Sequence, residues 1–375
     1  MSSRYEQRDI ILDRPSQPMK KNATIATVAA AAGVAVSTVS RYLNGHYVSQ
    51  PVRARLGEVI ETLGYSRSWT ARNLSLGRRG CIAVVVDSSA DPWFVQLLTG
   101  IEEELSARDT GLMLASLELR GTYDPGLVLE WVHARRVDGV ITAKSQRRER
   151  PLFRACAEAR LPTIAVVPDE APPGAHVVSC DNVAAGIAVA RHLTTLGHRR
   201  IAFAGGPAHS LDSRHRLRGL RIGLSEAGAG LSLARTYSCG SWDTPAGEAF
   251  AEQWLDGPRD ATAVVLANDA LAFGFLRVAQ QRGLRMPADL SIVGFDGLPQ
   301  GQLFLPALTT MAQPIREMGR AACRTLFANI EAPGQVGRTV FPMHLLVRES
   351  TSLPPDGISI CELSVDTQVT RSVQA

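Results

Sequence analysis

Apolar residues recur at helical spacing through the first part of the chain, where alanine is frequent. Between residues 24 and 76 no strand-like alternation interrupts this spacing, so the region is predicted to be all helical. We expect helices at 25–32, 36–43 and 50–63, which end at Gly33, Asn44-Gly45 and Gly64, and a shorter one at 68–76.

From Cys81 onward, short apolar runs alternate with amphipathic stretches. The runs, predicted as strands, are CIAVVV (81–86), LMLASL (112–117), GVITA (139–143), TIAVV (163–167), HVVS (176–179), IAFAG (201–205), AVVLA (263–267) and SIVGF (291–295). Predicted helices cover 94–108, 182–196, 213–227, 245–255, 270–282 and 315–329. This order predicts parallel sheets with helices on both faces. About 270 residues exceed one ordinary doubly wound sheet, so we expect two lobes, as in a nucleotide enzyme or a periplasmic-type binding protein.

The first two helices have the spacing of a helix-turn-helix. Gly33 turns the chain, and the second helix begins three residues later. Generic helical hairpins share this spacing, but the second helix exposes short donors and one long cation, Ser37, Thr38, Ser40 and Arg41. Such side chains hold phosphates, and arginine also reads guanine in the major groove.

Charge is distributed unevenly along the chain. The formal net charge is +4, but residues 1–80 carry twelve Lys/Arg and five Asp/Glu, a net +7 that leaves −3 for the remainder. A basic head on a slightly acidic body indicates a nucleic-acid-binding module joined to another domain, or a solvated basic face without a partner.

Several classes of protein lack their usual signals here. No apolar run approaches the length of a membrane span, and residues 1–23 are charged throughout, which argues against a secretory signal. The six cysteines form no Cys-x-x-Cys, so we expect reduced thiols in the cytoplasm and no metal site. Phosphate-loop, dinucleotide-loop, nucleophile-elbow and zinc-protease motifs are missing from the sequence, so we predict neither an enzyme nor a bound cofactor.

The motif TIATVAAAAGVAVSTVSRYLNG (24–45), followed by ARNL (71–74), resembles the head of LacI-type bacterial transcription regulators, the family of the lactose, galactose and purine repressors. The resemblance continues to about residue 350. It rests on DPWF (91–94), LGHRRIAFAGGP (196–207), ANDALAFG (267–274), SIVGFDG (291–297) and LTTMAQP (308–314). It implies an N-terminal all-α helix-turn-helix head and an α/β core like a periplasmic binding protein, with two doubly wound parallel-sheet lobes.

The resemblance also assigns DNA contacts to this sequence. Base-reading positions are Val36, Ser37 and Arg41; phosphate-contacting or helix-supporting positions are Thr24, Thr38, Ser40 and Asn44; Leu74 matches the leucine that wedges into the minor groove. The sequence departs from the family at three places. Ala35 replaces a capping serine, Thr27 stands where aspartate is common, and Arg67 replaces a proline before the hinge.

For the body, the resemblance implies a small effector held between the lobes. The matching positions are Phe94, Asp181, Arg216, Trp242, Asn268 and Asp296, and most of them follow predicted strands. These side chains suit a polyhydroxylated compound, while Phe94 and Trp242 leave a nucleobase open. Structural roles also remain open: Trp93 in the core, Arg216 in a surface salt bridge, and Asp269 as a helix cap.

The predicted organisation is a disordered arm (1–22), a helix-turn-helix domain (23–66), a hinge helix and linker (67–80), a two-lobed effector-binding and dimerisation domain (81–350) and a flexible tail (351–375). The predicted function is a cytoplasmic, homodimeric repressor that binds a palindromic DNA operator under the control of a small molecule, most simply a carbohydrate. The alternative is a sugar-binding protein without a DNA function. Whether the effector releases or promotes DNA binding stays open.

Overall fold

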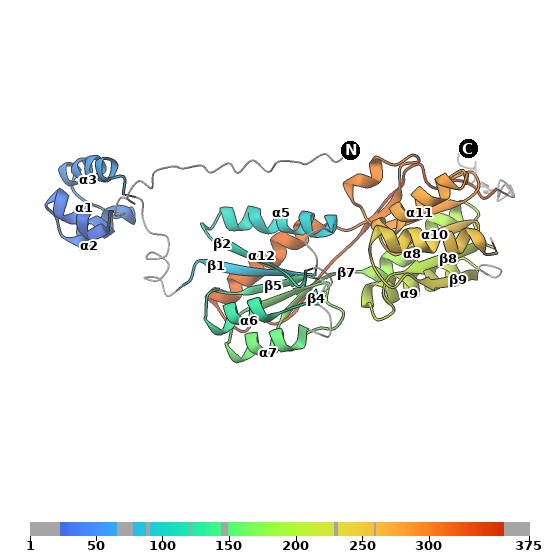
Figure 1. The fold of residues 1–375 in the computed structure, drawn as a ribbon, viewed down its shortest axis with the longest axis horizontal. Helices are drawn as coiled ribbons and strands as arrows, with labels where there is room; N and C mark the ends of the chain where they lie inside the picture. Colours follow the sequence, from blue (N-terminus) through green and yellow to red (C-terminus); the bar gives the residue numbers. More distant parts are fainter. Residues whose placement is uncertain are drawn as a thin grey trace, which may run out of the picture. The chain divides into compact units, whose positions relative to one another are not determined.

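The computed structural model describes residues 23–65, 78–87, 91–119, 122–143, 149–228, 232–258 and 260–355. These residues divide between Arg78 and Arg79 into two compact units, a head and a body (Figure 1). The predicted arm (1–22), most of the predicted hinge and nearly all of the tail lie outside the described residues.

The head consists of the predicted helices α1 (Ile25–Ala32), α2 (Val36–Leu43) and α3 (Gln50–Leu63), with the expected bounds. The axes of α1 and α2 are bent by 109°, an angle typical of a helix-turn-helix. Gly33 makes this turn possible, because its φ of 62° is a left-handed conformation that favours glycine. Val28, Val39 and Leu56, one from each helix, are fully buried and form the centre of a small core.

The helices of the head start with different caps. Thr24 and Thr27 form a capping box at α1: the Thr27 N–H donates to Thr24 Oγ1 (3.2 Å), and the Thr24 N–H donates to Thr27 Oγ1 (2.7 Å). Thr27 therefore has a structural role in place of the family's aspartate. Ala35 precedes α2 with φ −69° and ψ 149°, which suits a capping residue, but it has no side chain that can accept a hydrogen bond.

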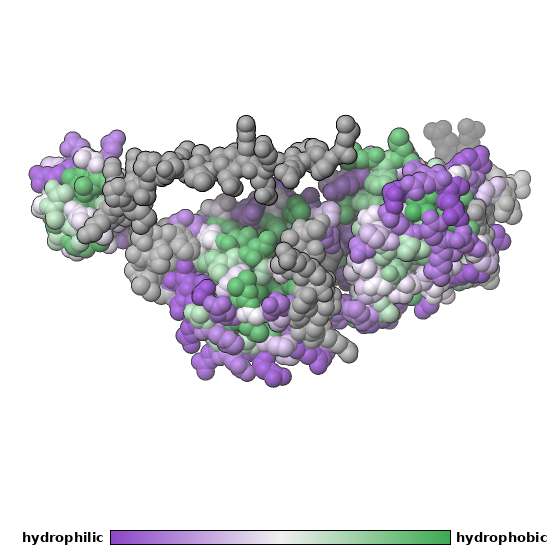
Figure 2. All heavy atoms as spheres, in the orientation of Figure 1, coloured by the Kyte–Doolittle hydropathy of each residue, from purple (hydrophilic) through white to green (hydrophobic). Residues whose placement is uncertain are grey.

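The first lobe of the body contains a parallel six-stranded sheet. Its order is β13 (Arg338–Phe341), β7 (His176–Cys180), β6 (Thr163–Val166), β5 (Val140–Ala143), β1 (Cys81–Val86) and β2 (Gly111–Ser116). In β1, Ile82, Val84 and Val86 belong to the core that includes α5 (Pro92–Ser106) and α12 (Ile315–Glu331). Ala83 and Val85 face α6 (Gly126–His133) and α7 (Arg150–Glu158). Hydrophilic residues cover the outer side of α7 (Figure 2). A short hairpin, β3 (Glu118–Leu119) and β4 (Thr122–Tyr123), completes this lobe.

The second lobe repeats the arrangement. Its sheet order is β14 (His344–Leu346), β12 (Thr309–Ala312), β11 (Ser291–Asp296), β10 (Ala263–Leu266), β8 (Arg200–Gly205) and β9 (Ser232–Ser238), in which only the β12–β14 pair is antiparallel. Helices α8 (Asn182–Thr195) and α9 (Leu211–Glu226) cover one face, and α10 (Thr244–Asp256) and α11 (Asp269–Gln281) cover the other. A short 3-10 helix, η2 (Pro299–Gln302), follows β11.

The chain passes three times between the lobes: from β7 to α8, from β12 to α12 and from β13 to β14. These passages are neighbours. The Asp181 N–H donates to the Phe341 carbonyl (3.0 Å), and the Cys180 thiol lies 3.7 Å from Gln313 Oε1. The two lobes are therefore joined by three neighbouring segments, an arrangement that allows a cleft to open and close.

The predicted fold class is confirmed: a helical head and two doubly wound lobes. The strands and helices predicted in the body recur within a few residues of their expected bounds. The sequence reading missed α6, α7, β9 and β12–β14, together with the small hairpin. β13 and β14 are exposed edge strands without a continuous apolar run, and this explains why periodicity did not find them.

A glycine contact determines how closely α8 and α9 approach each other. A Cβ added at Gly219 would overlap the Val183 carbonyl oxygen. We expect Gly219→Ala to lower the free energy of unfolding by about 1–3 kcal/mol, measured by chemical denaturation. Gly337→Ala is the control, since its Cβ would meet the His176 ring at an ordinary 3.5 Å. Equal stability of the two variants would contradict this packing.

The uncapped start of α2 gives a second prediction. Ala35→Ser should supply an acceptor for the first-turn amides and stabilise α2 by about 1 kcal/mol. Hydrogen exchange of the amides in the first turn of α2 in the full chain should then slow by about fivefold. Ala31→Ser places the same hydroxyl on an exposed position within α1 and should slow no exchange in α2. Unchanged exchange in Ala35→Ser would show that the first-turn amides of α2 gain no hydrogen bond from the new hydroxyl.

Candidate DNA-binding surface and ligand cleft

One face of α2 is exposed and chemically suited to DNA. Val36 is 46% exposed, and Ser37 and Arg41 are exposed beside it. Val39, on the opposite side of the same helix, is fully buried. The helix therefore presents the Ser37 hydroxyl and the Arg41 guanidinium to solvent, while its apolar side packs in the core of the head.

The other DNA positions predicted by resemblance have mixed roles. Thr38 and Ser40 are partly buried, and Asn44 Nδ2 donates to Ser40 Oγ (3.4 Å) at the end of α2. Thr24 is exposed, although its hydroxyl oxygen accepts within the capping box. Leu74 and Arg67 lie outside the described residues, so the wedge stays a prediction. Tyr47, which follows α2, is 80% exposed.

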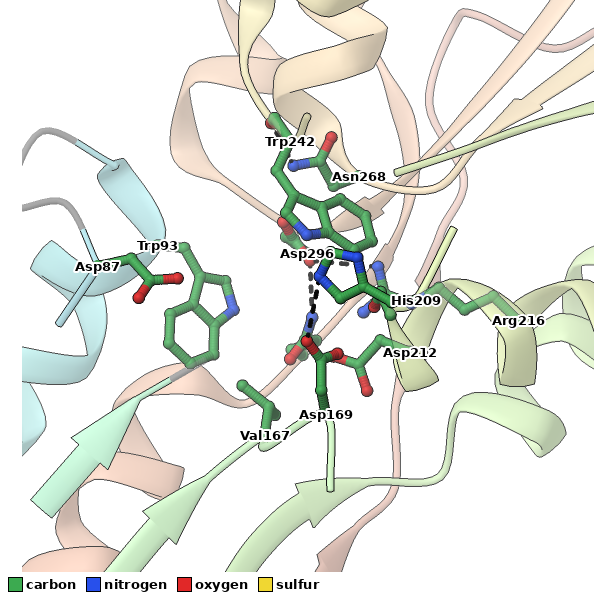
Figure 3. A pocket seen from close by; sticks show the side chains of 12 residues that line it. Asp87, Trp93, Val167, Asp169, His209, Asp212, Arg216, Trp242, Asn268 and Asp296 are labelled. Atoms are coloured by element: carbon green, nitrogen blue, oxygen red, sulfur yellow. Dashed lines mark hydrogen bonds and ion pairs between the residues drawn. The ribbon is translucent and has the colours of Figure 1, made fainter. Parts of the chain in front are cut away.

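A cleft of about 520 Å³ lies between the lobes of the body. Residues from both lobes line it (Figure 3): Asp87, Trp93, Val167, Asp169, His209, Ser210, Asp212, Arg216, Trp242, Asn268, Asp296 and Gln313. Nearly all of them follow the carboxyl end of a parallel strand or begin the helix after one. This is where open α/β sheets bind their ligands.

Arg216 is the buried cation of the cleft, with 2% of the residue exposed. Its Nε donates to Asn182 Oδ1 (2.8 Å), and its Nη1 donates to the carbonyl of Ala267. The guanidinium lies over the ring of Phe295 at 4.7 Å, and Nη1 is 3.8 Å from Asp296 Oδ1. Such a group is pre-positioned to donate to a ligand oxygen. The surface salt bridge considered from the sequence is not its role.

Asp296 ends β11 in an unusual backbone conformation, with φ at 111°. Its carboxylate accepts from Gln313 Nε2 at 2.6 Å, and its carbonyl accepts from the Gln313 N–H at 3.1 Å. The strained residue is thereby fixed against the second passage between the lobes. Backbone strain of this kind persists only where surrounding contacts over-determine it, and it gathers at functional sites.

The helix cap considered for Asp269 from the sequence is provided by its neighbour Asn268. Asn268 is the cap of α11: its Oδ1 accepts from the Leu271 N–H, and its Nδ2 donates to the Trp242 carbonyl. Asp269 is fully buried behind the cleft, where it accepts from Thr310 Oγ1 (2.6 Å). Burial, with the charge of Asp296 second, raises the pKa of Asp269 well above its usual value. Asp269 therefore supports the floor of the site and does not line it.

Four of the six predicted effector residues meet in this cleft: Arg216, Trp242, Asn268 and Asp296. Phe94 is outside the lining. It packs edge-on against Trp93, with ring centroids 5.4 Å apart. Both residues are 1% exposed and belong to the core, but only Trp93 also lines the cleft. Adjacent residues of a helix point about 100° apart, so α5 can aim only one of the two rings at the cleft, and that ring is Trp93.

Asp181 also lies outside the lining. Its side chain accepts from the Ala184 N–H (2.9 Å) and caps α8 at the first passage between the lobes. A cap of this kind uses one carboxylate oxygen and fixes the side chain along the helix start. Effector binding by Phe94 and Asp181 has no support in this geometry, and for the other four residues it stays a prediction.

Several lining residues are not predicted from the sequence, although one signal indicates most of them. Asp87 follows β1, Asp169 follows β6, His209 and Asp212 follow β8, and Gln313 follows β12. The strand-end rule covers the residues that follow predicted strands, Asp87, Asp169, His209 and Asp212. It does not reach Gln313, because β12 is not predicted from the sequence.

The described residues include no single helix long and apolar enough to cross a membrane. Within the same residues, no group of three or more His, Cys, Asp or Glu side chains is placed to hold a metal ion.

Known proteins with this sequence pattern are transcription regulators. Residues 24–68 match the lacI family of bacterial regulatory proteins, and residues 190–351 match a periplasmic binding protein-like domain. The HTH-type transcriptional regulator DegA of Bacillus subtilis (strain 168) is 31% identical, over 88% of this chain and 98% of its own length.

Solved structures give the same assignment. The lac repressor dimer bound to operator and the anti-inducer ONPF has a TM-score of 0.77 at 26% identity, covering 88% of this chain and 100% of that one. The complex of the transcriptional regulator CelR with cellobiose has a TM-score of 0.65 at 30% identity, with the same coverage. The chain belongs to the LacI family of bacterial regulatory proteins and is a DNA-binding transcriptional regulator.

Proposed function

We propose that this protein is a cytoplasmic repressor that binds a palindromic operator as a homodimer and is controlled by a small polyhydroxylated effector in the cleft. The observation that carries the proposal is the cleft itself, where polar groups from both lobes surround a space of about 520 Å³ beside a buried guanidinium. A ligand that contacts both lobes stabilises their closed arrangement, and operator affinity changes with it.

The DNA part of the proposal is supported by α2. One short helix with Val36, Ser37 and Arg41 exposed contacts few base pairs, so a two-fold dimer on a palindrome supplies the missing contacts. The related lac repressor was solved as a dimer on operator. Val36 and Ser37 are small and offer modest base readout, which gives DNA shape and phosphate contacts a larger share.

The effector part is supported by the composition of the lining. Trp93 and Trp242 offer indole plates, and Arg216, Asn268 and Asp296 offer donors and acceptors for hydroxyl groups. The related CelR was solved with cellobiose, a carbohydrate. A carbohydrate is therefore the first effector class to test.

The rival function, a sugar-binding protein without DNA activity, agrees with the body alone. It leaves the helix-turn-helix and its exposed polar face without a purpose, and the relatives that match nearly the whole chain are regulators. The same relatives favour a role without catalysis.

Arg41 tests the DNA part. Arg41→Ala removes an exposed guanidinium from α2 and should weaken binding to the promoter beside the protein's own gene by about tenfold or more. Fluorescence anisotropy on this duplex and on random duplex at fixed salt measures the loss and the selectivity. Arg136→Ala, at an exposed arginine of the body, is the matched control and should bind like the wild type. Wild-type protein without preference for the promoter over random duplex would overturn the proposed function.

Trp242 tests the effector part. Trp242→Ala removes one indole from the cleft and should abolish the effector response while operator affinity without effector stays within about twofold. A thermal-shift screen of sugars on the wild type identifies the effector, and operator titrations with and without this sugar follow for both proteins. Arg41→Ala should show the reverse pattern, with sugar binding retained and operator binding lost. An undiminished response in Trp242→Ala would place the effector elsewhere.

A further inference from the structure

The charged groups of the cleft are strongly unbalanced. Four carboxylates line it, from Asp87, Asp169, Asp212 and Asp296, against the single guanidinium of Arg216. Arg216 lies beside Asp296 and is already held by Asn182 and the Ala267 carbonyl. It therefore compensates the carboxylate of Asp296, whereas no lysine or arginine pairs with Asp169 or Asp212 in the ion pairs found among the described residues.

Asp169 reaches from the first lobe to the second. It follows β6, and its Oδ1 accepts from the Leu211 N–H (3.2 Å) at the start of α9. Its Oδ2 lies 3.6 Å from Nε2 of His209, a ring that is 60% exposed and charged only when protonated. Burial is the main cause that raises the pKa of Asp169. The hydrogen bond from the Leu211 N–H and the charge of His209 lower this pKa, and the charge of Asp212 raises it by a smaller amount.

Asp212 belongs to the second lobe, in the first turn of α9. Its Oδ1 accepts from Asn182 Nδ2 (2.8 Å), and none of the ion pairs found among the described residues includes it. Figure 3 shows Asp169 and Asp212 next to each other, with His209 above them. Two carboxylates from opposite lobes thus face one space and repel each other.

An organic cation fits this space better than a neutral sugar. An ammonium between the two carboxylates replaces their repulsion by two charge-assisted hydrogen bonds. The indoles of Trp93 and Trp242 provide apolar and π surfaces for the rest of the ligand, and Arg216 and Asn268 remain for hydroxyl groups. The lining therefore has a place for an amine and a place for a polyol.

We propose that the effector is an amino sugar in the chemical sense, a polyhydroxylated ring with one protonated amino group, and that Asp169 and Asp212 hold this ammonium from opposite lobes. The inference rests on the proposed function, because it specifies the ligand of the same cleft. It also gives the ligand a direct route to closure, since the ammonium binds one carboxylate of each lobe.

The experiment compares sugars that differ only in the amine. Isothermal titration of the full-length protein uses glucosamine, galactosamine and mannosamine, each beside its parent hexose and its N-acetyl form, in buffer with EDTA. At least one amino sugar should bind about tenfold tighter than both of its neutral counterparts. Asp169→Asn and Asp212→Asn keep the shape and an acceptor oxygen, and each should reduce this preference by about tenfold.

Asp256→Asn is the matched control, because this carboxylate is exposed at the end of α10, where it pairs with Arg282 outside the cleft. It should leave the preference intact. Operator binding without sugar, and a thermal midpoint near that of the wild type, should show for all three variants that the protein is folded.

Three results would overturn the proposal: neutral sugars that bind as tightly as the amino sugars, a preference that survives in both cleft variants, or no binding of any amino sugar. A neutral sugar that binds and shifts operator affinity would contradict the requirement for an amino group, but it would agree with the proposed function. Loss of selective operator binding by the wild type would instead remove the proposed function, whatever the sugars do.

Discussion

The buried guanidinium of Arg216 is the interaction on which the cleft depends. A cation with 2% exposure is costly to bury unless every neighbour compensates it, and here an amide oxygen, a backbone carbonyl, an aromatic ring and Asp296 surround it. These partners come from α8, from the segment after β10 and from β11, so one side chain fixes three neighbouring elements. Removing the guanidinium would take away the positive charge beside Asp296, which is buried near a second carboxyl group, that of Asp269.

Much of the architecture could be predicted from periodicity alone. The three head helices agree with their predicted bounds, and β1 agrees with the run CIAVVV, because buried parallel strands are continuously apolar. Edge strands escaped for the same reason: β13 alternates exposed and partly buried residues and carries no such run. The hydrophobic pattern of a sequence reflects burial, so the exposed edge strands of a sheet are hard to predict from it.

The site was harder to predict than the fold, and the differences between the predicted residues and the observed lining have a common cause. Resemblance marks a position along the chain, whereas binding depends on where the side chain points. Phe94 and Trp93 are neighbours on α5, yet only Trp93 faces the cleft. Asp181 has a carboxylate of the expected kind, but a helix start uses it. Asp169 and Asp212 were accessible through the strand-end rule, which depends on topology and not on likeness.

For regulation, it matters more that a ligand contacts both lobes of the cleft than that it binds tightly. A ligand that touches one lobe binds the open and the closed body equally well, and such a ligand shifts no equilibrium however tightly it binds. Asp169 and Asp212 belong to different lobes and repel each other, which opposes closure, while the contacts of Asp169 with the Leu211 N–H and His209 favour it. An ammonium between the two carboxylates replaces their repulsion by attraction. Because this attraction exists only in the closed body, all of it contributes to the free-energy difference between the open and the closed state. A pair of like charges that face each other across a cleft is therefore a sensitive place to couple binding to closure.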